Sequence, residues 1–292
     1  MGGPLTGLLL IDKPANWTSH DVVAKLRGVL GTREIGHAGT LDPQATGLLV
    51  LAIGGATRWL NYLPGDKTYS ATVRFGVETD TEDIWGQVLK QQDASGLKEE
   101  AVREALESLT QLKEQIPPMV SALKKDGRRL YDLAREGQIV EREARPVQVN
   151  AIRVTAVRPG EADFEVDCGA GTYVRTLCAE AGKKLGVGAC MAALQRTRSG
   201  KFQLSDAAPE AQWTLEQLQG RLLDASRALA NLGSVDLDDA QAADILHGRS
   251  VKLAQGSEGT WRLNHGGRLL ALAELTGQGS DWKAAPKRVF NA

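Results

Sequence analysis

Cysteine and histidine are scarce in this sequence, and neither is spaced as metal sites require. The chain of 292 residues has three cysteines, and no two of them form a Cys-x-x-Cys pair. The cysteines are Cys168, Cys178 and Cys190, and the histidines are His20, His37, His247 and His265. An odd number of scattered cysteines is typical of reduced intracellular thiols. We therefore expect no disulfide, no metal site and a cytoplasmic location.

Long apolar runs and an excess of one charge are also missing. The longest apolar runs are far shorter than the roughly 20 residues that cross a membrane, and we identify no signal peptide. The 35 basic and 36 acidic side chains nearly cancel. Their distribution is uneven, because residues 78–107 carry nine acids and three bases, and residues 175–201 carry six bases and one acid. The second stretch suits either a phosphate-binding surface or an ordinary solvated face.

Glycine, by contrast, is plentiful, and residues 36–47 combine it with proline around one carboxylate. These residues read GHAGTLDPQATG, and the apolar run 48–51 follows at once. Gly and Pro at this density predict an irregular loop. Because Asp42 precedes a proline, its backbone is biased toward extended geometry. The pattern predicts a carboxylate held above a buried strand, and the simpler alternative is an Asx turn.

Strand and helix patterns alternate irregularly over the first 232 residues, which predicts an α+β domain with a mixed sheet. The expected strands are 7–11, 48–53, 69–75, 147–157 and 163–168. The expected helices are one beginning near Ser19 and those at 56–63, 97–109, 128–136, 173–185 and 213–232. Residues 169–172 resemble half of a dinucleotide-binding turn, but Val174 stands where the third glycine belongs. A helix N-terminus that binds an anion remains the alternative there.

The end of the chain predicts a second, smaller unit. Residues 233–236 have the composition of a linker, a helix pattern follows at 237–247, and glycine-punctuated strands follow it. So short a unit is marginally stable unless it packs on its neighbour. We divide the chain into a domain at 1–232 and a β-rich domain at 237–292.

The 36–47 stretch, read as Gly-His-x-Gly-x-Leu-Asp-Pro-x-Ala-Thr-Gly, resembles the signature of the TruB family, the bacterial tRNA pseudouridine synthases of the T-loop uridine. Other family motifs follow in order: Gly-x-Leu-x-x-Asp-Lys-Pro at 7–14, Lys-x-Tyr-x-Ala at 67–71, Thr-Asp-Thr-x-Asp at 79–83, Gly-x-Tyr-Val-Arg at 171–175 and Leu-Gln-Arg-Thr at 194–197. One departure is Val120, which stands where the family has tyrosine in Pro-Pro-x-Tyr-Ser-Ala. The small unit at 237–292 resembles the RNA-binding PUA domain, more loosely than the earlier motifs resemble those of the TruB family.

This resemblance implies a mainly antiparallel catalytic sheet and the roles of three residues. Asp42 is the catalytic carboxylate, acting as nucleophile or base. Arg175 is the ion-pair partner of this carboxylate. The helix dipole disfavours a cation in a first helical turn, which independently indicates that Arg175 has an anionic partner; the alternative is an ordinary surface arginine. Tyr69 stacks on the flipped uracil and helps to move a proton; otherwise it is a core aromatic.

The resemblance also implies four substrate-binding residues, each with an ordinary structural alternative. His37 lies beside the vacated base stack, or is simply a loop histidine, and Leu194 forms a wall of the uracil pocket, or is a core leucine. Lys13 supports the site, or is a surface lysine. Tyr173, in the Gly-x-Tyr-Val-Arg motif, is the fourth. The implied reaction is isomerisation of uridine 55 in the tRNA T loop, without a cofactor or obligate protein partner, by a monomer.

Three other functions remain open at this point. A non-catalytic RNA-binding or tRNA-folding module would not need an Asp-Tyr-Arg trio, although tRNA folding is compatible with the enzyme as an accessory activity. A catalytic subunit of a guide-RNA particle shares the motif but usually carries basic extensions. A glycosidase would need two carboxylates flanking the bond, and the sequence constrains only Asp42.

Overall fold

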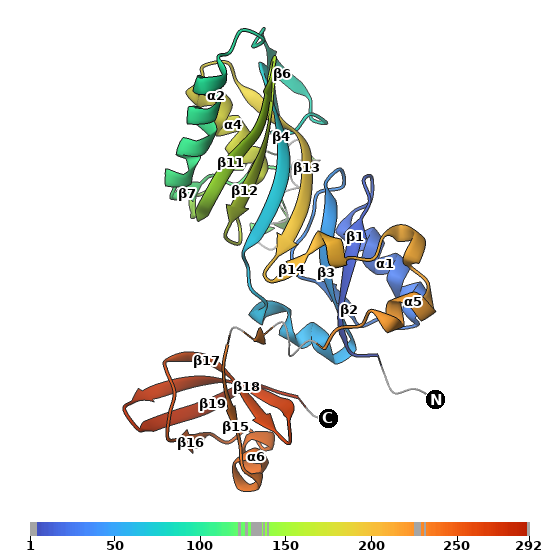
Figure 1. Cartoon of the computed structure of the whole chain (residues 1–292), viewed down its shortest axis with the longest axis vertical. Coiled ribbons are helices and arrows are strands. Elements are labelled where there is room, and N and C mark those ends of the chain that lie inside the picture. Colours follow the sequence, from blue (N-terminus) through green and yellow to red (C-terminus); the bar gives the residue numbers. More distant parts are fainter. Residues whose placement is uncertain are drawn as a thin grey trace.

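The computed structural model describes residues 5–121, 124–125, 128–129, 136, 138, 140–224, 229–230 and 232–290. A large sheet with its helices forms the upper part of the molecule, and a smaller C-terminal sheet lies below it (Figure 1). Within the described ranges, no helix is long and apolar enough to cross a membrane.

The large sheet has the strand order β1-β3-β13-β4-β12-β11, with β2 paired to β3 and β14 to β13. The strands are β1 (Gly7–Lys13), β2 (Ile35–His37), β3 (Thr46–Ile53), β4 (Lys67–Phe75), β11 (Val149–Arg158), β12 (Glu161–Cys168), β13 (Ala189–Ser199) and β14 (Phe202–Gln203). All neighbours run antiparallel except β13 and β3, which pair in parallel over two residues. The predicted mixed, mainly antiparallel sheet is confirmed.

Helices and short hairpins complete the upper part. The helices are α1 (Ser19–Leu30), α2 (Glu99–Glu107), α4 (Val174–Lys184) and α5 (Leu215–Gly220), with 3₁₀ turns η1 (Gly54–Tyr62), η2 (Ser108–Gln111), η3 (Leu204–Asp206) and η4 (Glu210–Gln212). The short strands are β5 (Val77–Thr79), β6 (Val88–Gln91), β7 (Glu114–Gln115), β8 (Lys124–Lys125), β9 (Arg128–Arg129) and β10 (Arg145–Pro146). Helix α1 begins at a capping box in which Thr18 and Asp21 satisfy each other's backbone amides, as its sequence favours.

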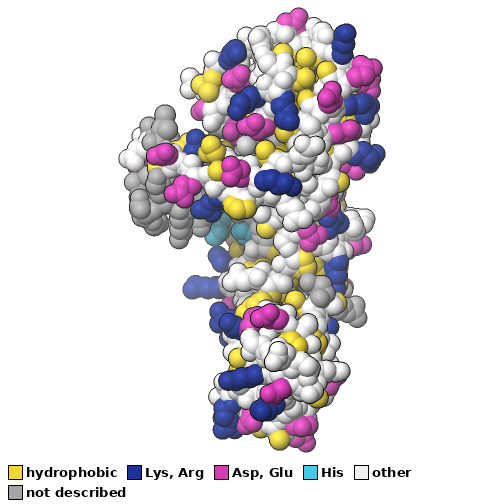
Figure 2. All heavy atoms as spheres, turned by 90° about the vertical axis from the view of Figure 1, so that its left-hand side faces the viewer, with side chains coloured by type: hydrophobic (Ala, Val, Ile, Leu, Met, Phe, Trp, Pro, Cys, Tyr) yellow, Lys and Arg dark blue, Asp and Glu magenta, His cyan; other side chains and the backbone are white. Residues whose placement is uncertain are grey.

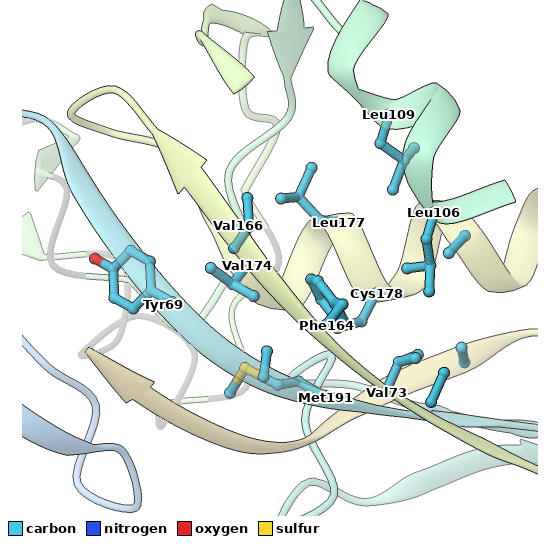
Figure 3. Close-up of a cluster of buried hydrophobic side chains, with 14 of the residues drawn as sticks. Tyr69, Val73, Leu106, Leu109, Phe164, Val166, Val174, Leu177, Cys178 and Met191 are labelled. Atoms are coloured by element: carbon cyan, nitrogen blue, oxygen red, sulfur yellow. The ribbon is translucent and has the colours of Figure 1, made fainter. Parts of the chain in front are cut away.

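A buried cluster fixes α4 against the sheet. Figure 3 shows Val174, Leu177 and Cys178 of α4 packed over side chains of the sheet, including Phe164. Phe164 and Leu177 are fully buried, and burial of such side chains contributes about 1.5–3 kcal/mol each. Tyr69 lies at one end of this cluster with its hydroxyl pointing away from it (Figure 3). The core therefore fixes both the start of α4 and the ring of Tyr69.

The C-terminal part is a five-stranded sheet with one helix. Its elements are β15 (Gly233–Asp236), α6 (Asp239–Leu246), β16 (Val251–Leu253), β17 (Gly259–His265), β18 (Arg268–Gln278) and β19 (Asp281–Val289), in the sheet order β15-β17-β18-β19-β16. It packs on the upper part through an edge-to-face contact between Phe290 and Trp59, whose ring centroids are 4.9 Å apart. Leu272 of β18 belongs to the same buried cluster as Trp59.

Four local predictions differ from the structure. Residues 233–236, predicted as a linker, form β15, because parallel pairing with β17 gives their backbone groups partners. The helix predicted at 213–232 forms α5 at 215–220 and is interrupted at Leu223, whose backbone pairs with Leu8 of β1; residues 225–228 and 231 lie outside the described residues. The segment 56–63 lies largely in the 3₁₀ turn η1. Of the helix predicted at 128–136, residues 128–129 form β9 instead, and residues 130–135 lie outside the described residues.

Candidate active site

The loop that carries Asp42 runs between β2 and β3 and is tied to α1. The hydroxyl of Ser19 accepts a hydrogen bond from the backbone N–H of Leu41 at 2.9 Å and donates one to the Leu41 carbonyl at 3.2 Å. At the end of the loop, Gly47 has φ +97° and lies so close to β13 that a Cβ atom would be 2.4 Å from the Arg196 carbonyl oxygen. The glycine that ends the motif is therefore required by both backbone conformation and space.

Lys13 supports the same loop from beneath and is not a surface residue. Its side chain is fully buried, and its ammonium donates to the carbonyls of Pro14, Trp17 and Pro43 at 2.9, 2.6 and 3.0 Å. Burial lowers the pKa of Lys13 to about 8, while the nearby Asp42 carboxylate acts in the opposite direction. Three accepting carbonyls and a carboxylate together explain how a buried ammonium is tolerated.

Asp42 and Arg175 form a side-on ion pair. Nε of Arg175 lies 3.1 Å from Oδ2 of Asp42, and Nη2 donates to Oδ1 at 3.5 Å. The Arg175 side chain is 4% exposed, whereas that of Asp42 is 38% exposed. The structure thus brings together the two residues that the sequence analysis paired, with the arginine in the interior and the carboxylate open to the cavity.

The other donors of Arg175 have partners too. Nη1 donates to the Thr81 carbonyl and Nη2 to the Val120 carbonyl, both at 2.9 Å, and Nη1 lies 3.6 Å from Oδ2 of Asp83. These contacts hold the guanidinium plane in one orientation. Because Val120 contributes its backbone carbonyl, the departure from the family's tyrosine does not remove this bond.

The surroundings of Asp42 shift the pKa of its carboxyl group in opposite directions. Burial raises the pKa of Asp42 above its ordinary value, and the neighbouring Asp83 carboxylate raises it further. The charges of Arg175 and Lys13 act in the opposite direction on this pKa. The site therefore holds a carboxylate whose ionised form depends on two cations, which is typical of functional carboxylates.

A cavity of about 260 Å³ opens beside this ion pair. Its lining comes from the 39–42 loop, β4, Ser121, the segment 169–173 before α4, the start of α4 and β13. The lining side chains include Asp42, Tyr69, Tyr173, Arg175, Leu194 and Arg196. The lining combines apolar and aromatic side chains with convergent charged groups, an arrangement that suits a small planar ligand with polar edges.

Tyr69, in β4, is 8% exposed. Burial raises the pKa of its phenol, and the cationic Arg196 acts against that rise. The side chain therefore serves both as the end of the core and as a wall of the cavity.

Two candidates, Lys13 and His37, are absent from the described residues that line the cavity. Lys13 lies behind the Asp42 loop, as described above, whereas His37 ends β2, opposite Leu51 of β3. Its predicted role beside the vacated base stack stays a prediction. Within the described part of the chain, no group of three or more His, Cys, Asp or Glu side chains is arranged to hold a metal ion.

Two supporting residues carried no role in the sequence analysis. Arg196 is fully buried and donates to the carbonyls of Leu48 and Gly39 at 2.7 and 3.1 Å, fixing the motif loop to β13. Gln115 is 4% exposed and binds the backbone of Tyr173. Arg196 is part of a recognised motif and could have been found there, whereas nothing in the sequence singles out Gln115.

Three family models match successive parts of this chain. The model described as TruB family pseudouridylate synthase (N terminal domain) matches residues 27–174. The model described as tRNA pseudouridylate synthase B C-terminal domain matches residues 175–235. The model described as Pseudouridine synthase II TruB, C-terminal matches residues 233–290. The matches thus include the Asp42 loop, the Arg175 helix and the small sheet.

Whole proteins are similar over nearly the full length. A protein from Heliobacterium mobile named tRNA pseudouridine synthase B is 40% identical to this chain, over 98% of this chain and 95% of the relative. A protein of the same name from Leifsonia xyli subsp. xyli is 43% identical, over 95% of each chain. A solved chain from "Crystal Structure of a Cbf5-Nop10-Gar1 Complex" has a TM-score of 0.75 at 25% identity, over 98% of this chain and 85% of that one. The similarity therefore covers both sheets.

Proposed function

Because this chain belongs to the TruB family of pseudouridine synthases, isomerases that act on tRNA uridine, we propose that it converts uridine 55 in the T loop of tRNA to pseudouridine. The observation that carries this proposal is the Asp42 carboxylate, held side-on by the buried Arg175 at a cavity lined by Tyr69 and Leu194. This arrangement supplies one oriented anion beside a space for a planar base.

The reaction breaks the N1–C1′ glycosidic bond, turns the uracil and joins C5 to C1′, after which C5 loses a proton and N1 gains one. Asp42 acts on the electron-poor sugar as a nucleophile or removes a proton as a base, and both roles require its ionised form. Arg175 keeps this form available and fixes its direction. No atom is gained or lost overall, so the reaction is an isomerisation.

The remaining side chains of the cavity hold the base. In this proposal the ring of Tyr69 stacks on the uracil, and its phenol helps to transfer the C5 proton. Leu194 and Tyr173 contribute further parts of the wall, Lys13 keeps the Asp42 loop in place, and His37 stands near the vacated base stack. Because Asp42 lies in a recess of the protein, we propose that the nucleotide leaves its stack to bring its base there.

The rest of the tRNA needs a surface for its phosphates. Figure 2 shows Lys and Arg side chains gathered along one edge of the C-terminal part. Lys252 of β16 stands opposite Lys283 of β19 in the sheet, and like charges in that position destabilise a sheet unless an anion or acid compensates them. Lys252 also pairs with Asp281 at 3.5 Å. We assign this domain, 237–292 with β15 before it, to tRNA binding, and residues 1–232 to catalysis.

The alternative functions receive less support. Among the described carboxylates only Asp42 lines the cavity, whereas a glycosidase needs two. The solved Cbf5 chain is in a complex with Nop10 and Gar1 by its title, whereas we propose that this chain acts on tRNA alone, as a monomer in the cytoplasm. A pure tRNA-folding module would not require the Asp42–Arg175 pair.

The test is release of tritium from tRNA transcript labelled at uridine C5. The chain should release the label of one uridine per tRNA, and a matched transcript with cytidine at position 55 should release none. Equal release from both transcripts would show that the target is another uridine, and no release from either would overturn the proposed function.

A further inference from the structure

Gln115 joins two segments that lie on the same side of the active site. It ends the two-residue strand β7, where its backbone pairs with Arg145 of β10. Its side-chain amide reaches Tyr173, 58 residues further along. The Tyr173 N–H donates to Oε1 of Gln115 at 2.9 Å, and Nε2 of Gln115 donates to the Tyr173 carbonyl at 3.2 Å. One amide thus satisfies both backbone groups of one residue.

Tyr173 is the residue at which α4 begins. It is the N-cap of the helix, and its own side chain makes no capping hydrogen bond. Its carbonyl also accepts the Leu177 N–H at 3.2 Å, the first bond of the helix. The side chain of Gln115 therefore fixes the point from which α4 starts, and Arg175 follows two residues later in the first turn.

The segment after Gln115 reaches the guanidinium itself. The Val120 carbonyl accepts from Nη2 of Arg175 at 2.9 Å, and the Pro117 carbonyl accepts from Arg142 at 3.0 Å. Between Gln115 and Val120 the chain thus contacts both the backbone before Arg175 and the end of its side chain. If the bond at Gln115 is lost, both contacts can shift together.

We propose that Gln115 is a positioning residue that sets Arg175 against Asp42 and holds Tyr173 at the cavity wall. This inference rests on the proposed function, since it concerns the rate of that reaction. Its physical reason is that the amide both accepts and donates in a site that is 4% exposed, so no water can easily replace it. A displacement of about 1 Å in such a site lowers a rate by about 100-fold.

The first experiment compares Gln115→Ala with Gln92→Ala in single-turnover tritium release and tRNA binding. Gln92 is a matched control, because its amide donates to the Gly186 carbonyl at 3.2 Å, just beyond the other end of α4. We expect Gln115→Ala to lower the rate at saturating tRNA by about 10-fold or more, with affinity within about three-fold. Gln92→Ala should keep the native rate.

A second variant distinguishes positioning from a loss of packing. In Gln115→Glu the side chain keeps its size and still accepts the Tyr173 N–H, but an ionised carboxylate cannot donate to the Tyr173 carbonyl. A protonated carboxyl can. The ratio of the variant rate to the native rate should therefore rise as the pH is lowered, whereas a role in packing alone leaves this ratio constant.

Each outcome separates this inference from the proposed function. Failure of the native chain to release label overturns the proposed function. Native release with an equal rate in folded Gln115→Ala, or an equal loss in both Ala variants, overturns the positioning role alone. If Gln115→Ala does not fold, the pH dependence of the Gln115→Glu ratio decides, and a constant ratio contradicts the proposal.

Discussion

Asp42 and Arg175 are 133 residues apart in the chain, yet they meet as an ion pair in which only the carboxylate faces open space. Arg175 is 4% exposed and also binds two backbone carbonyls, so its direction is fixed before any ligand arrives. Preorganised charge of this kind needs little rearrangement during a reaction. The pair therefore both orients Asp42 and favours its ionised form.

Arg175→Lys should lower the single-turnover rate by about 100-fold or more, because an ammonium cannot reproduce the side-on contact and the two carbonyl bonds together. Tritium release at saturating tRNA measures this rate. Arg153→Lys is the matched control, since Arg153 pairs with Glu165 on an exposed strand at 2.6 Å. A native rate in folded Arg175→Lys would show that the pair does not matter to the reaction.

The rate should depend on the ionisation of Asp42. Its pKa is raised mainly by burial, so protonation removes the reactive form at a higher pH than for an ordinary carboxyl group. The single-turnover rate should fall on the acid side with a midpoint above about pH 4, the range of an exposed aspartate. Label release measured across pH tests this, and a rate unchanged down to that pH would contradict it.

Lys13→Met should move the acid limb of the pH–rate profile, the range over which the rate falls as the pH is lowered, to higher pH. The positive charge of Lys13 lowers the pKa of Asp42, so removing the charge lets that pKa rise further. The change also leaves three buried carbonyls without their donor, at about 1–3 kcal/mol each. We expect a lower Tm as well as the shifted limb, and neither in the control Lys25→Met on the exposed side of α1. An unshifted limb would show that Lys13 acts only on stability.

Removal of the C-terminal part should weaken binding more than catalysis. The cut belongs after Leu232, because β15 is part of the smaller sheet. Loss of phosphate contacts should weaken tRNA binding and make its dependence on salt shallower, while turnover at saturating tRNA persists. Affinity at two salt concentrations and saturated turnover are the measurements. Loss of turnover in a folded truncated chain would place this part in the active site.

The parts of the site that could be predicted from the sequence are those in which a local residue pattern itself indicates the chemistry. The 36–47 loop is irregular because its Gly and Pro residues exclude helix and strand, and Arg175 in a first helical turn called for a partner. Long-range supports were not predictable in this way. Gln115 has no local signature, and Lys13 was equally compatible with the surface, because the carbonyls that bury it come partly from Pro43, 30 residues away.

The same limit applies to the fold. The apolar strands of the main sheet show clear patterns, and the structure contains them. Residues 233–236 have turn-like composition, and only pairing with β17 makes them a strand. The helix pattern at 213–232 was interrupted for the same reason, since the Leu223 backbone binds Leu8 of β1. Such pairings depend on segments far apart in the chain, which local composition cannot report.

The most direct measurement for the central claim is tritium release from C5-labelled tRNA by Asp42→Asn. The amide preserves the shape of the side chain but is neither a nucleophile nor a base. We predict that release falls to background while tRNA affinity stays within about three-fold of the native value, because phosphate contacts outside the cavity supply most of the binding. Appreciable release by this folded variant would contradict the assignment of Asp42 as the catalytic carboxylate.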